Sequence, residues 1–518
     1  MSSPEHSSLT KAIPLPTPKG PQDLDTENLR QKTVRGIGIT AVAQGVSFVL
    51  RTGSMIVLAR LLFPKDFGLV GMVTALTGFL NLFRDFGLSL ATVQRPSLSD
   101  EQVSAVFWVN CTVGILLAAL CTAVAPFLVV FYREPRLLWV TIVLGTGFVF
   151  TGAAAQHRAM LQRRMRFGLL AVVDMIALVI GIASAIGMAV TGLGYWALVA
   201  MAVATPAVGL AAVWVATPWL PGRPRFQVGI RSMLMYGGTV TLNNIVMYFA
   251  YNVDKVLLGR FCGAELLGIY GRAYQLINLP TDNLNSTAFL VAFPSLSRIQ
   301  NDPARVRSYF LKGYSLFLAV VIPISASCAL FAEDIIRVFL GAKWHDASSI
   351  FRLLVPTIVV FALINPIGWL MLATGYAGRS LKIALMLAPI VIAGYVLGLP
   401  YGPQGVAAGF SAAMVLVAVP VIIWSKHGTL ITGNDILRAI APSMVCSVVA
   451  AAVALAASGI TNRVDIPFLR LVAESAVVFV VYLIMLLFVL NQKSMYLELL
   501  RDTKLWPRGG WKRKVKAK

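Results

Sequence analysis

Long apolar segments, separated by short polar stretches, recur along almost the whole chain. Residues 169–190 and 469–490, for example, carry very little charge, and each has about the 20 residues that an α-helix needs to cross the hydrocarbon core of a membrane. Polar and apolar positions do not alternate in segments of about ten residues, which is the pattern of outer-membrane barrels. The pattern therefore predicts an all-α polytopic membrane protein.

Apolar windows of roughly 20 residues predict about fourteen transmembrane helices. The first 32 residues contain several charges and prolines but no apolar core, so they are not expected to form a secretory signal. The predicted spans are 33–58, 67–93, 103–131, 137–157, 168–191, 195–219, 230–257, 266–293, 308–331, 351–374, 380–398, 402–425, 436–458 and 468–491.

Two stretches of the chain, LARLLFPKDFGLVG at 58–71 and LGRFCGAELLGIYG at 258–271, repeat one pattern. An even number of predicted spans separates the copies, so both enter the membrane from the same side. The halves are therefore expected to be parallel repeats, and transporters commonly place their substrate path between such halves. The identical residues at equivalent positions are Leu58 and Leu258, Arg60 and Arg260, Gly68 and Gly268, and Gly71 and Gly271.

The repeat and the spans together predict two six-helix lobes and an additional helix pair. The last two spans fall outside the repeat and are expected to be an accessory hairpin. The predicted division is a disordered cytoplasmic N-terminus at 1–32, an N-lobe at 33–220, a C-lobe at 230–425, accessory spans at 436–491 and a basic cytoplasmic tail at 492–518.

Composition agrees with a membrane protein. The chain is 58% hydrophobic and 13% charged, whereas an ordinary globular domain is roughly 45–50% apolar and about 25% charged. With the N-terminus inside, most Lys and Arg residues fall on the cytoplasmic side, which predicts a multi-pass bacterial inner-membrane protein with both termini in the cytoplasm. The formal charge of +22 is then explained by topology, and the basic loops and tail are expected to contact anionic lipid rather than nucleic acid.

Four basic residues interrupt predicted spans: Arg51, Arg84, Lys255 and Arg272. A charge at membrane depth costs at least ~2.5–3.5 kcal/mol, so such side chains usually face the interior of a helix bundle or a water-filled cavity. Arg51 and Arg84 have no basic counterpart in the second copy, and this asymmetry favours a functional role over an architectural one. The four residues are therefore candidates for substrate binding.

Acidic residues in the spans are candidates for binding a coupling ion: Asp85, Asp254 and Asp282. For Asp254, beside Lys255, an ion pair between helices or snorkelling to the interface explains the charge equally well. Helix bending and backbone capping are the simpler explanation for Asp282, which follows Pro280. Asp174 lies near a span end as a lone acid.

A polar strip runs along the seventh predicted span. Asn244, Tyr248 and Asn252 are spaced four residues apart, so they share one helical face that could donate hydrogen bonds to a polyhydroxylated ligand. These residues are added to the substrate-binding candidates. Hydrogen bonding between helices is an equally ordinary explanation for them.

Several enzyme and pump classes lack their expected signatures. The phosphate-binding pattern GxxxxGK[ST] is absent, so direct coupling to ATP is not expected. The loops are short, whereas membrane-bound polymerases and ligases usually carry a large loop outside the membrane. Cysteines and histidines lack the paired spacing of metal sites, so neither a metal nor a cofactor is expected.

Ordered segments of the chain resemble the Wzx-type polysaccharide flippases of the multidrug/oligosaccharidyl-lipid/polysaccharide exporter superfamily. The first half contributes RLLFPKDFGLVGM, FRDFGLSLATVQRPSLSDEQVSAVFWVN, FYREPRL and HRAMLQRRMRF. The second half contributes NVDKVLLGRFCGAELLGIYGRAYQLINLP, VAFPSLSRIQND and WLMLATGYAG. The resemblance covers about residues 33 to 425.

This resemblance implies a V-shaped transporter that moves undecaprenyl-diphosphate-linked oligosaccharide repeat units across the inner membrane by alternating access, for exopolysaccharide, capsule or lipopolysaccharide synthesis. It further implies a cationic central cavity, to which Arg51, Arg84, Lys255 and Arg272 are assigned on physical grounds, because guanidinium groups bind phosphate bidentately and Lys acts as a point charge. Polysaccharide polymerase or export machinery would be a partner.

Two alternatives stay open at this stage. A cation-coupled multidrug exporter of the same superfamily would have a more acidic or apolar cavity and would transport cationic dyes. An integral membrane glycan polymerase or ligase would form product from purified lipid-linked substrate without any sidedness.

Overall fold

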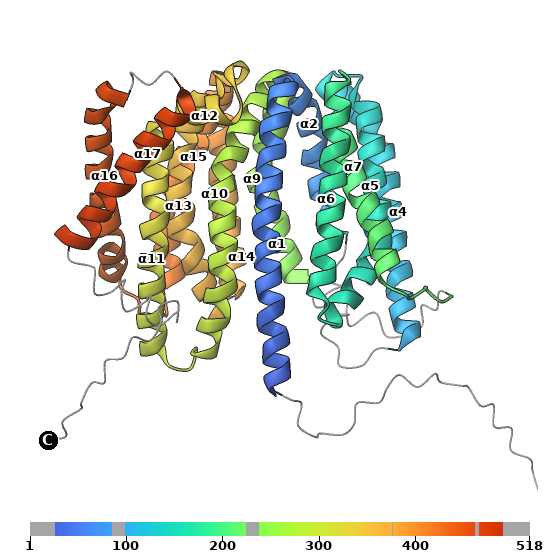
Figure 1. Cartoon of the computed structure of the whole chain (residues 1–518), viewed down its shortest axis with the longest axis horizontal. Helices are drawn as coiled ribbons and strands as arrows, with labels where there is room; N and C mark the ends of the chain where they lie inside the picture. The colour runs from blue at the N-terminus through green and yellow to red at the C-terminus, as the bar shows by residue number, and fades with distance from the viewer. Residues whose placement is uncertain (1–25, 85–98, 224–237, 376, 462–465, 491–518) are drawn as a thin grey trace, which may run out of the picture.

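The computed structural model of the protein describes residues 26–84, 99–223, 238–375, 377–461 and 466–490, and these residues form helices and loops without any strand (Figure 1). Fourteen long helices within these ranges coincide one by one with the predicted spans. They are α1 (Thr26–Leu61), α2 (Pro64–Asn81), α4 (Asp100–Tyr132), α5 (Leu137–Arg163), α6 (Phe167–Val190), α7 (Trp196–Ala216), α9 (Gly238–Phe261), α10 (Gly263–Arg298), α11 (Pro303–Leu330), α13 (Ala347–Ala373), α14 (Ala377–Gly398), α15 (Gly402–Lys426), α16 (Gly433–Thr461) and α17 (Pro467–Ile484).

Helix α2 is shorter than its predicted span. The span was expected to run from 67 to 93, but α2 ends at Asn81, so Arg84 follows the helix instead of interrupting it. At its other end α2 begins with Pro64, and the backbone N–H of Phe63 donates to a side-chain oxygen of Asp66 at 3.0 Å. Proline in the first turn and an acidic residue capping from the third position are ordinary helix-start features.

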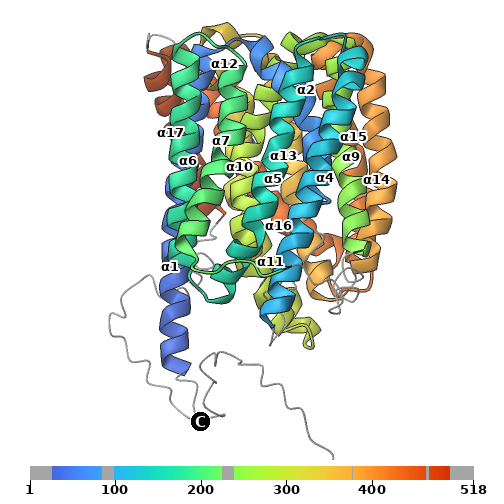
Figure 2. The ribbon, with the colours of Figure 1, turned by 90° about the vertical axis from the view of Figure 1, so that its right-hand side faces the viewer.

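Small residues bring antiparallel neighbours together. A β-carbon placed on Gly394 of α14 would lie 2.5 Å from the carbonyl oxygen of Gly409 in α15, and one on Gly398 would lie 2.1 Å from that of Gly405. Close backbone contact through small residues is a main source of helix packing in membranes, because lipid offers no hydrophobic drive for association. In Figure 2 the helices α4 to α7 of the first half, which pack against one another, face the viewer.

The first half (α1 to α7) and the second half (α9 to α15) meet through α2 and α10, where repeat-related residues contact each other reciprocally. A β-carbon on Gly68 would lie 1.6 Å from the carbonyl oxygen of Ala264, and one on Gly268 would lie 1.9 Å from that of Pro64. Because Pro64 and Ala264 occupy equivalent positions, the two contacts are copies of each other. This reciprocity is the expected mark of a two-fold relation between parallel repeats.

A short segment of the second half closes over the end of α1. It comprises α12 (Ala332–Phe339) and the 3₁₀ turn Ala342–Trp344. The indole N–H of Trp344 donates to the carbonyl oxygen of Ala59 at 2.9 Å, and Arg60 Nη2 donates to that of Val338 at 3.0 Å. Trp344 is fully buried. We call this contact, together with the Gly68–Ala264 and Gly268–Pro64 contacts, the seal.

The last two helices lie outside the repeat, against α11 and α12 at the edge of the second half (Figure 1). Arg470 of α17 forms an ion pair with Asp334 of α12. Arg307 of α11 binds Asp435 of α16 through two nitrogens, at 2.7 to 3.0 Å. These contacts attach the helix pair to the flank of the second half, away from the junction of the halves.

Candidate functional site

Helices α2, α9 and α10 differ in composition from the other long helices. Ten helical stretches within the described residues are apolar and long enough to cross a membrane, and α2, α9 and α10 are not among them. The same three helices join the two halves. Polar residues at membrane depth usually face protein or water rather than lipid, so the junction is where the candidate site residues are expected to gather.

One group of predicted site residues does gather on α9. Lys255 Nζ donates to Asn252 Oδ1 at 2.6 Å, Asn252 Nδ2 donates to the backbone oxygen of Tyr248 at 2.9 Å, and the Tyr248 hydroxyl donates to the carbonyl oxygen of Ala75 in α2 at 2.7 Å. Lys255 also lies 5.6 Å from the ring centre of Tyr274. Tyr248 thus makes a hydrogen bond between helices, which is the alternative that the sequence left open, whereas the hydrogen bonds of Asn252 stay within α9.

Asp254 lies on the other side of α9, fully buried. The hydroxyl of Tyr270 in α10 donates to its Oδ2 at 2.8 Å, while Oδ1 has no hydrogen-bond partner among the described residues. Tyr270 stacks on Tyr274 at 6.0 Å between ring centres, and within the same ranges the buried hydroxyl of Tyr395 also lacks a partner. A buried carboxyl with one free oxygen is a plausible place to hold a proton, because a lone buried carboxylate is costly.

Arg272 of α10 reaches across the junction. Its guanidinium carbon lies 4.1 Å from the ring centre of Phe67 in α2, and Nη1 donates to Gln275 Oε1. Cation–π contacts of this kind are favourable and leave the charge itself unneutralised. Arg272 therefore places a positive charge between the halves.

The remaining candidates are more open. Arg51, Asn244 and Asp282 are exposed in the isolated protein, and within the described part of the chain none of their side chains forms an ion pair. Asp85 lies outside the described residues. The structure thus gathers Tyr248, Asn252 and Lys255, and within the described residues no hydrogen bond or ion pair joins Arg51, Asn244 or Asp282 to that group.

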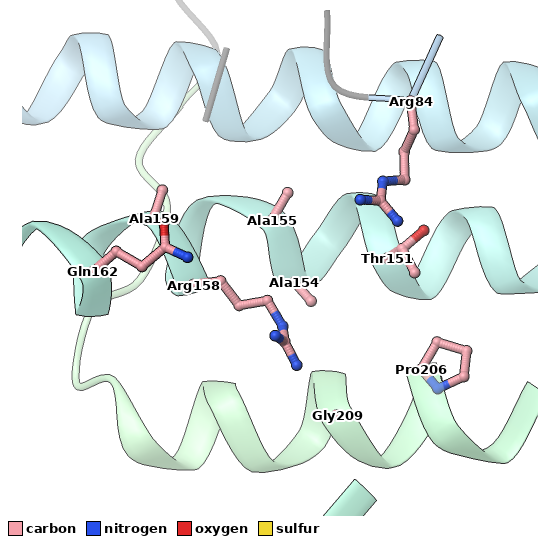
Figure 3. Close-up of a pocket in the computed structure, with 9 residues that line it drawn as sticks. All are labelled: Arg84, Thr151, Ala154, Ala155, Arg158, Ala159, Gln162, Pro206 and Gly209. Carbon is pink, nitrogen blue, oxygen red and sulfur yellow. The ribbon is translucent and has the colours of Figure 1, made fainter. Parts of the chain in front are cut away.

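Arg84 lines a cavity of about 330 Å³ within the first half, as Figure 3 shows. The cavity lies between the residues that follow α2 and helices α5 and α7. Its other lining residues are Thr151, Ala154, Ala155, Arg158, Ala159, Gln162, Pro206 and Gly209.

The sequence gives no sign of this cavity. Arg158 and Gln162 are four residues apart and share a face of α5, but the sequence is equally consistent with Arg158 as a cytoplasmic arginine at the end of a span. Asp174, treated as a lone acid, in fact forms an ion pair with Arg158 across the turn between α5 and α6. The small residues that make room for the cavity carry no signal of their own.

Comparison with known proteins gives the family. Residues 57–349 match the family model described as "Polysaccharide biosynthesis protein". This chain belongs to the polysaccharide biosynthesis protein family.

Curated relatives of this family member have consistent names. It is 25% identical over 399 residues to the lipopolysaccharide biosynthesis protein WzxC of Escherichia coli (strain K12), covering 76% of this chain and 80% of that protein. It is 27% identical over 304 residues to the teichuronic acid biosynthesis protein TuaB of Bacillus subtilis (strain 168), covering 58% of this chain and 63% of that protein. The succinoglycan biosynthesis transport protein ExoT of Rhizobium meliloti (strain 1021) is 23% identical, with 64% and 67% covered.

Solved structures share the fold of this polysaccharide biosynthesis protein. The lipid II flippase MurJ in an inward closed conformation superposes with a TM-score of 0.69 and 15% identity, covering 90% of this chain and 99% of that chain. An inward-facing multidrug transporter of the MATE family gives a TM-score of 0.58 and 16% identity, covering 76% and 97%. The predicted family and the all-helical, multi-pass membrane fold are confirmed.

Proposed function

We propose that this family member is a flippase, which moves polyprenyl-diphosphate-linked oligosaccharide repeat units across the bacterial inner membrane by alternating access. One observation carries the proposal. None of the four intramembrane cations, Arg51, Arg84, Lys255 and Arg272, forms an ion pair with any carboxylate among the described residues. Lys255 and Arg272 lie at the junction of the halves, and Arg51 and Arg84 belong to the first half. Cations without a carboxylate partner suit an anionic cargo, since guanidinium and ammonium groups bind phosphate strongly.

The names of the relatives support this proposal. They concern biosynthesis of lipopolysaccharide, teichuronic acid and succinoglycan, and one of them is called a transport protein. They agree with a transporter rather than an enzyme. Undecaprenyl diphosphate is the carrier that we propose for this chain, and the N-terminal side of the bundle is the side that we propose to be cytoplasmic.

The seal suggests which side of the path is closed. Trp344, Arg60, Gly68 and Gly268 join the halves at the end of the bundle where α1 ends and α2 begins. Arg51 lies on α1 roughly 15 Å from that end, at a rise of 1.5 Å per residue, and it is exposed. We therefore propose that this state receives cargo from the N-terminal side, and that the seal must part before the glycan is released on the other.

Asp254 is our proposed coupling group. Its buried carboxyl, with one oxygen free, could carry a proton during the return of the empty transporter. Asp85 and Asp282 stay as further candidates. The predicted division into lobes, the contact of the basic tail with anionic lipid and an association with polymerase or export machinery are likewise part of the proposal.

Sided transport tests the function directly. Purified protein is reconstituted in liposomes that contain a fluorescent undecaprenyl-diphosphate-linked oligosaccharide, and an impermeant lectin or quencher reports the leaflet. We expect the protein to move the glycan between leaflets. Transport of cationic dyes without movement of the glycan would support the drug exporter, and formation of longer glycans would support the polymerase.

A further inference from the structure

The cavity lined by Arg84 brings together two arginines that the sequence separates by the whole of α4 and most of α5. Arg84 comes from the residues after α2 and extends toward α5 beside Thr151, whereas Arg158 extends from α5 toward α7 (Figure 3). Thr151 and Gln162 add polar groups to the wall. Two guanidinium groups that line one cavity could each bind one phosphate of a diphosphate.

Small side chains create the space. Ala154, Ala155 and Ala159 line one wall on α5, and Gly209 lines the opposite wall on α7. A β-carbon on Gly209 would lie 3.6 Å from Arg158 Nη2, so a larger side chain there would extend into the cavity. At about 330 Å³, the cavity has the size of a small ligand site.

Arg158 is held in a way that a ligand can displace. Its ion pair with Asp174 lies at the surface of the isolated protein, with side-chain exposures of 35% and 52%, and exposed ion pairs contribute little to stability. Asp174 approaches Arg158 at one nitrogen, which leaves the other donors of the guanidinium for a ligand. Arg84 forms no ion pair among the described residues. Within the described residues, the cavity therefore has one cation without an ion-pair partner, Arg84, and one that is weakly engaged, Arg158.

The position of the cavity suits an entry point. Arg84 lies 16 residues after Gly68 of the seal, roughly 24 Å at 1.5 Å per residue, and it shares the cavity with Arg158. Both are therefore at the opposite end of the bundle. Three more arginines, Arg163, Arg164 and Arg166, lie within eight residues after Arg158. Clustered positive charge raises the local concentration of anions.

We propose that the Arg84–Arg158 cavity is a diphosphate-binding site, separate from the cations at the junction of the halves, where the headgroup of the lipid-linked cargo docks before it enters the path between the halves. This inference rests on the proposed function for the identity of the cargo. The shared chemistry is a diphosphate, which could be attached to a polyprenyl chain or be free in solution, and the docking role requires the former.

Binding to full-length protein in phosphatidylcholine nanodiscs tests the site, with inorganic pyrophosphate as the probe. We expect Arg84→Gln and Arg158→Gln each to weaken pyrophosphate binding by about tenfold or more, and Gly209→Val to weaken it without removing a charge. We expect Asp174→Asn to strengthen binding a few-fold, roughly the effect of releasing one exposed ion pair. A merely structural role for Arg158 predicts the opposite sign for Asp174→Asn. Arg136→Gln, at the α4–α5 turn, is the matched control and should bind as wild type.

Competition then identifies the source of the diphosphate. Undecaprenyl diphosphate added to the nanodisc should displace pyrophosphate, whereas phosphatidylglycerol should not. Equal displacement by both lipids, or no displacement by undecaprenyl diphosphate, would overturn the docking role. Unchanged pyrophosphate binding by both arginine variants, with wild-type melting temperatures, would overturn the site itself.

The liposome assay separates this inference from the proposed function. If wild type moves the glycan and the arginine variants bind normally, the function stands and the site is wrong. If pyrophosphate binding depends on both arginines but wild type moves no glycan, the site stands and the function is wrong. With both correct, Arg158→Gln should raise the cargo concentration needed for half-maximal transport more than it lowers the maximal rate.

Discussion

The two copies of the repeat are alike where they touch and unlike where they carry charge. Gly68 and Gly268 make the same backbone contact with the opposite half, and Arg60 and Arg260 both reach across, to Val338 and to the ring of Phe131. Yet Arg51 corresponds to Tyr251, and Ser54 corresponds to Asp254. The symmetric residues are therefore suited to a contact that opens and closes, and the asymmetric ones to chemistry that each half performs separately.

The two halves carry different charged groups. The first half offers open cations, Arg51 and Arg84, and the cavity at Arg158. The second half offers a buried acid enclosed by tyrosines, with Lys255 tied to Asn252. In our proposal the first half receives the anionic headgroup and the second half responds to protons.

The largest expected effect comes from substituting larger residues for Gly68 and Gly268, the glycines of the symmetric contact between the halves. Gly68→Val and Gly268→Val should each destabilise the described state by about 3 kcal/mol, because backbone atoms of the partner helix leave no room. The measurement is the melting temperature together with the reactivity of a cysteine placed at Ala59, which should rise as the seal opens.

The matched controls lie one turn away. A β-carbon on Gly71 would only touch Leu267 at 3.6 Å, and one on Gly271 would meet nothing within 4 Å. Gly71→Ala and Gly271→Ala should therefore behave as wild type. Clearly different losses of stability in Gly68→Val and Gly268→Val would contradict the equivalence of the two contacts.

The buried acid is the next test. Asp254→Asn keeps an acceptor for Tyr270, so it should change the free energy of unfolding by less than about 1 kcal/mol. It should nevertheless lower proton-driven transport by about tenfold or more, since the group can no longer exchange a proton. Transport with and without an imposed pH gradient measures this. The counterpart Ser54→Ala removes only a bond within α1 and should have little effect; full pH-driven transport by Asp254→Asn would exclude the coupling role.

The attached helix pair distinguishes the second half further. Arg470→Gln leaves Asp334, which is 7% exposed, without its ion-pair partner. The free energy of unfolding should fall by roughly 1–3 kcal/mol. Arg307→Gln breaks a pair whose arginine is 43% exposed, so it should lower stability clearly less, because exposed ion pairs contribute little. Thermal unfolding of both variants gives the order, and glycan transport should persist in each. A transport defect in Arg470→Gln at a temperature where it is folded would place the pair in the mechanism.

The smallest expected effects concern Arg60 and Arg260. Within the described residues, the side chain of each reaches the opposite half through one contact, a hydrogen bond for Arg60 and a ring contact at 5.7 Å for Arg260. Arg60→Gln and Arg260→Gln should each lower stability by about 0.5–1 kcal/mol. Melting curves of the two single variants and of the double variant measure this, and we expect additive effects because the sites do not share a partner. A strong departure from additivity would show that the seal acts as one unit.

The fold followed from the sequence because hydropathy and repetition are strong signals. Each of the fourteen predicted spans corresponds to a helix. Gly68 and Gly268, which the sequence alignment pairs, contact Ala264 and Pro64, and these two residues are also equivalent in the repeat. The end of α2 could not be predicted, because the apolar run continues past Asn81. Hydropathy reports where a chain prefers lipid and contains little information on where a helix stops.

The site was less predictable. Charges inside spans pointed to the right helices, since Lys255, Asp254 and Arg272 do lie at the junction. Their partners did not follow from spacing, because Tyr248 and Ala75, or Arg272 and Phe67, are brought together only by packing of the two halves. The cavity at Arg158 exists because Ala154, Ala155 and Gly209 are small. Small residues are common throughout the spans, so their positions do not predict a cavity.

Transport by a variant without the open cations tests the central claim most directly. In the liposome assay, Arg51→Gln/Arg84→Gln should move the undecaprenyl-diphosphate-linked oligosaccharide about a hundredfold more slowly than wild type, because each lost charge-assisted bond is worth roughly 1.5–3 kcal/mol and 1.4 kcal/mol is a factor of ten. The melting temperature should stay near that of wild type and of Arg136→Gln, since neither arginine has an ion-pair partner among the described residues. Wild-type transport by the folded double variant would contradict the account.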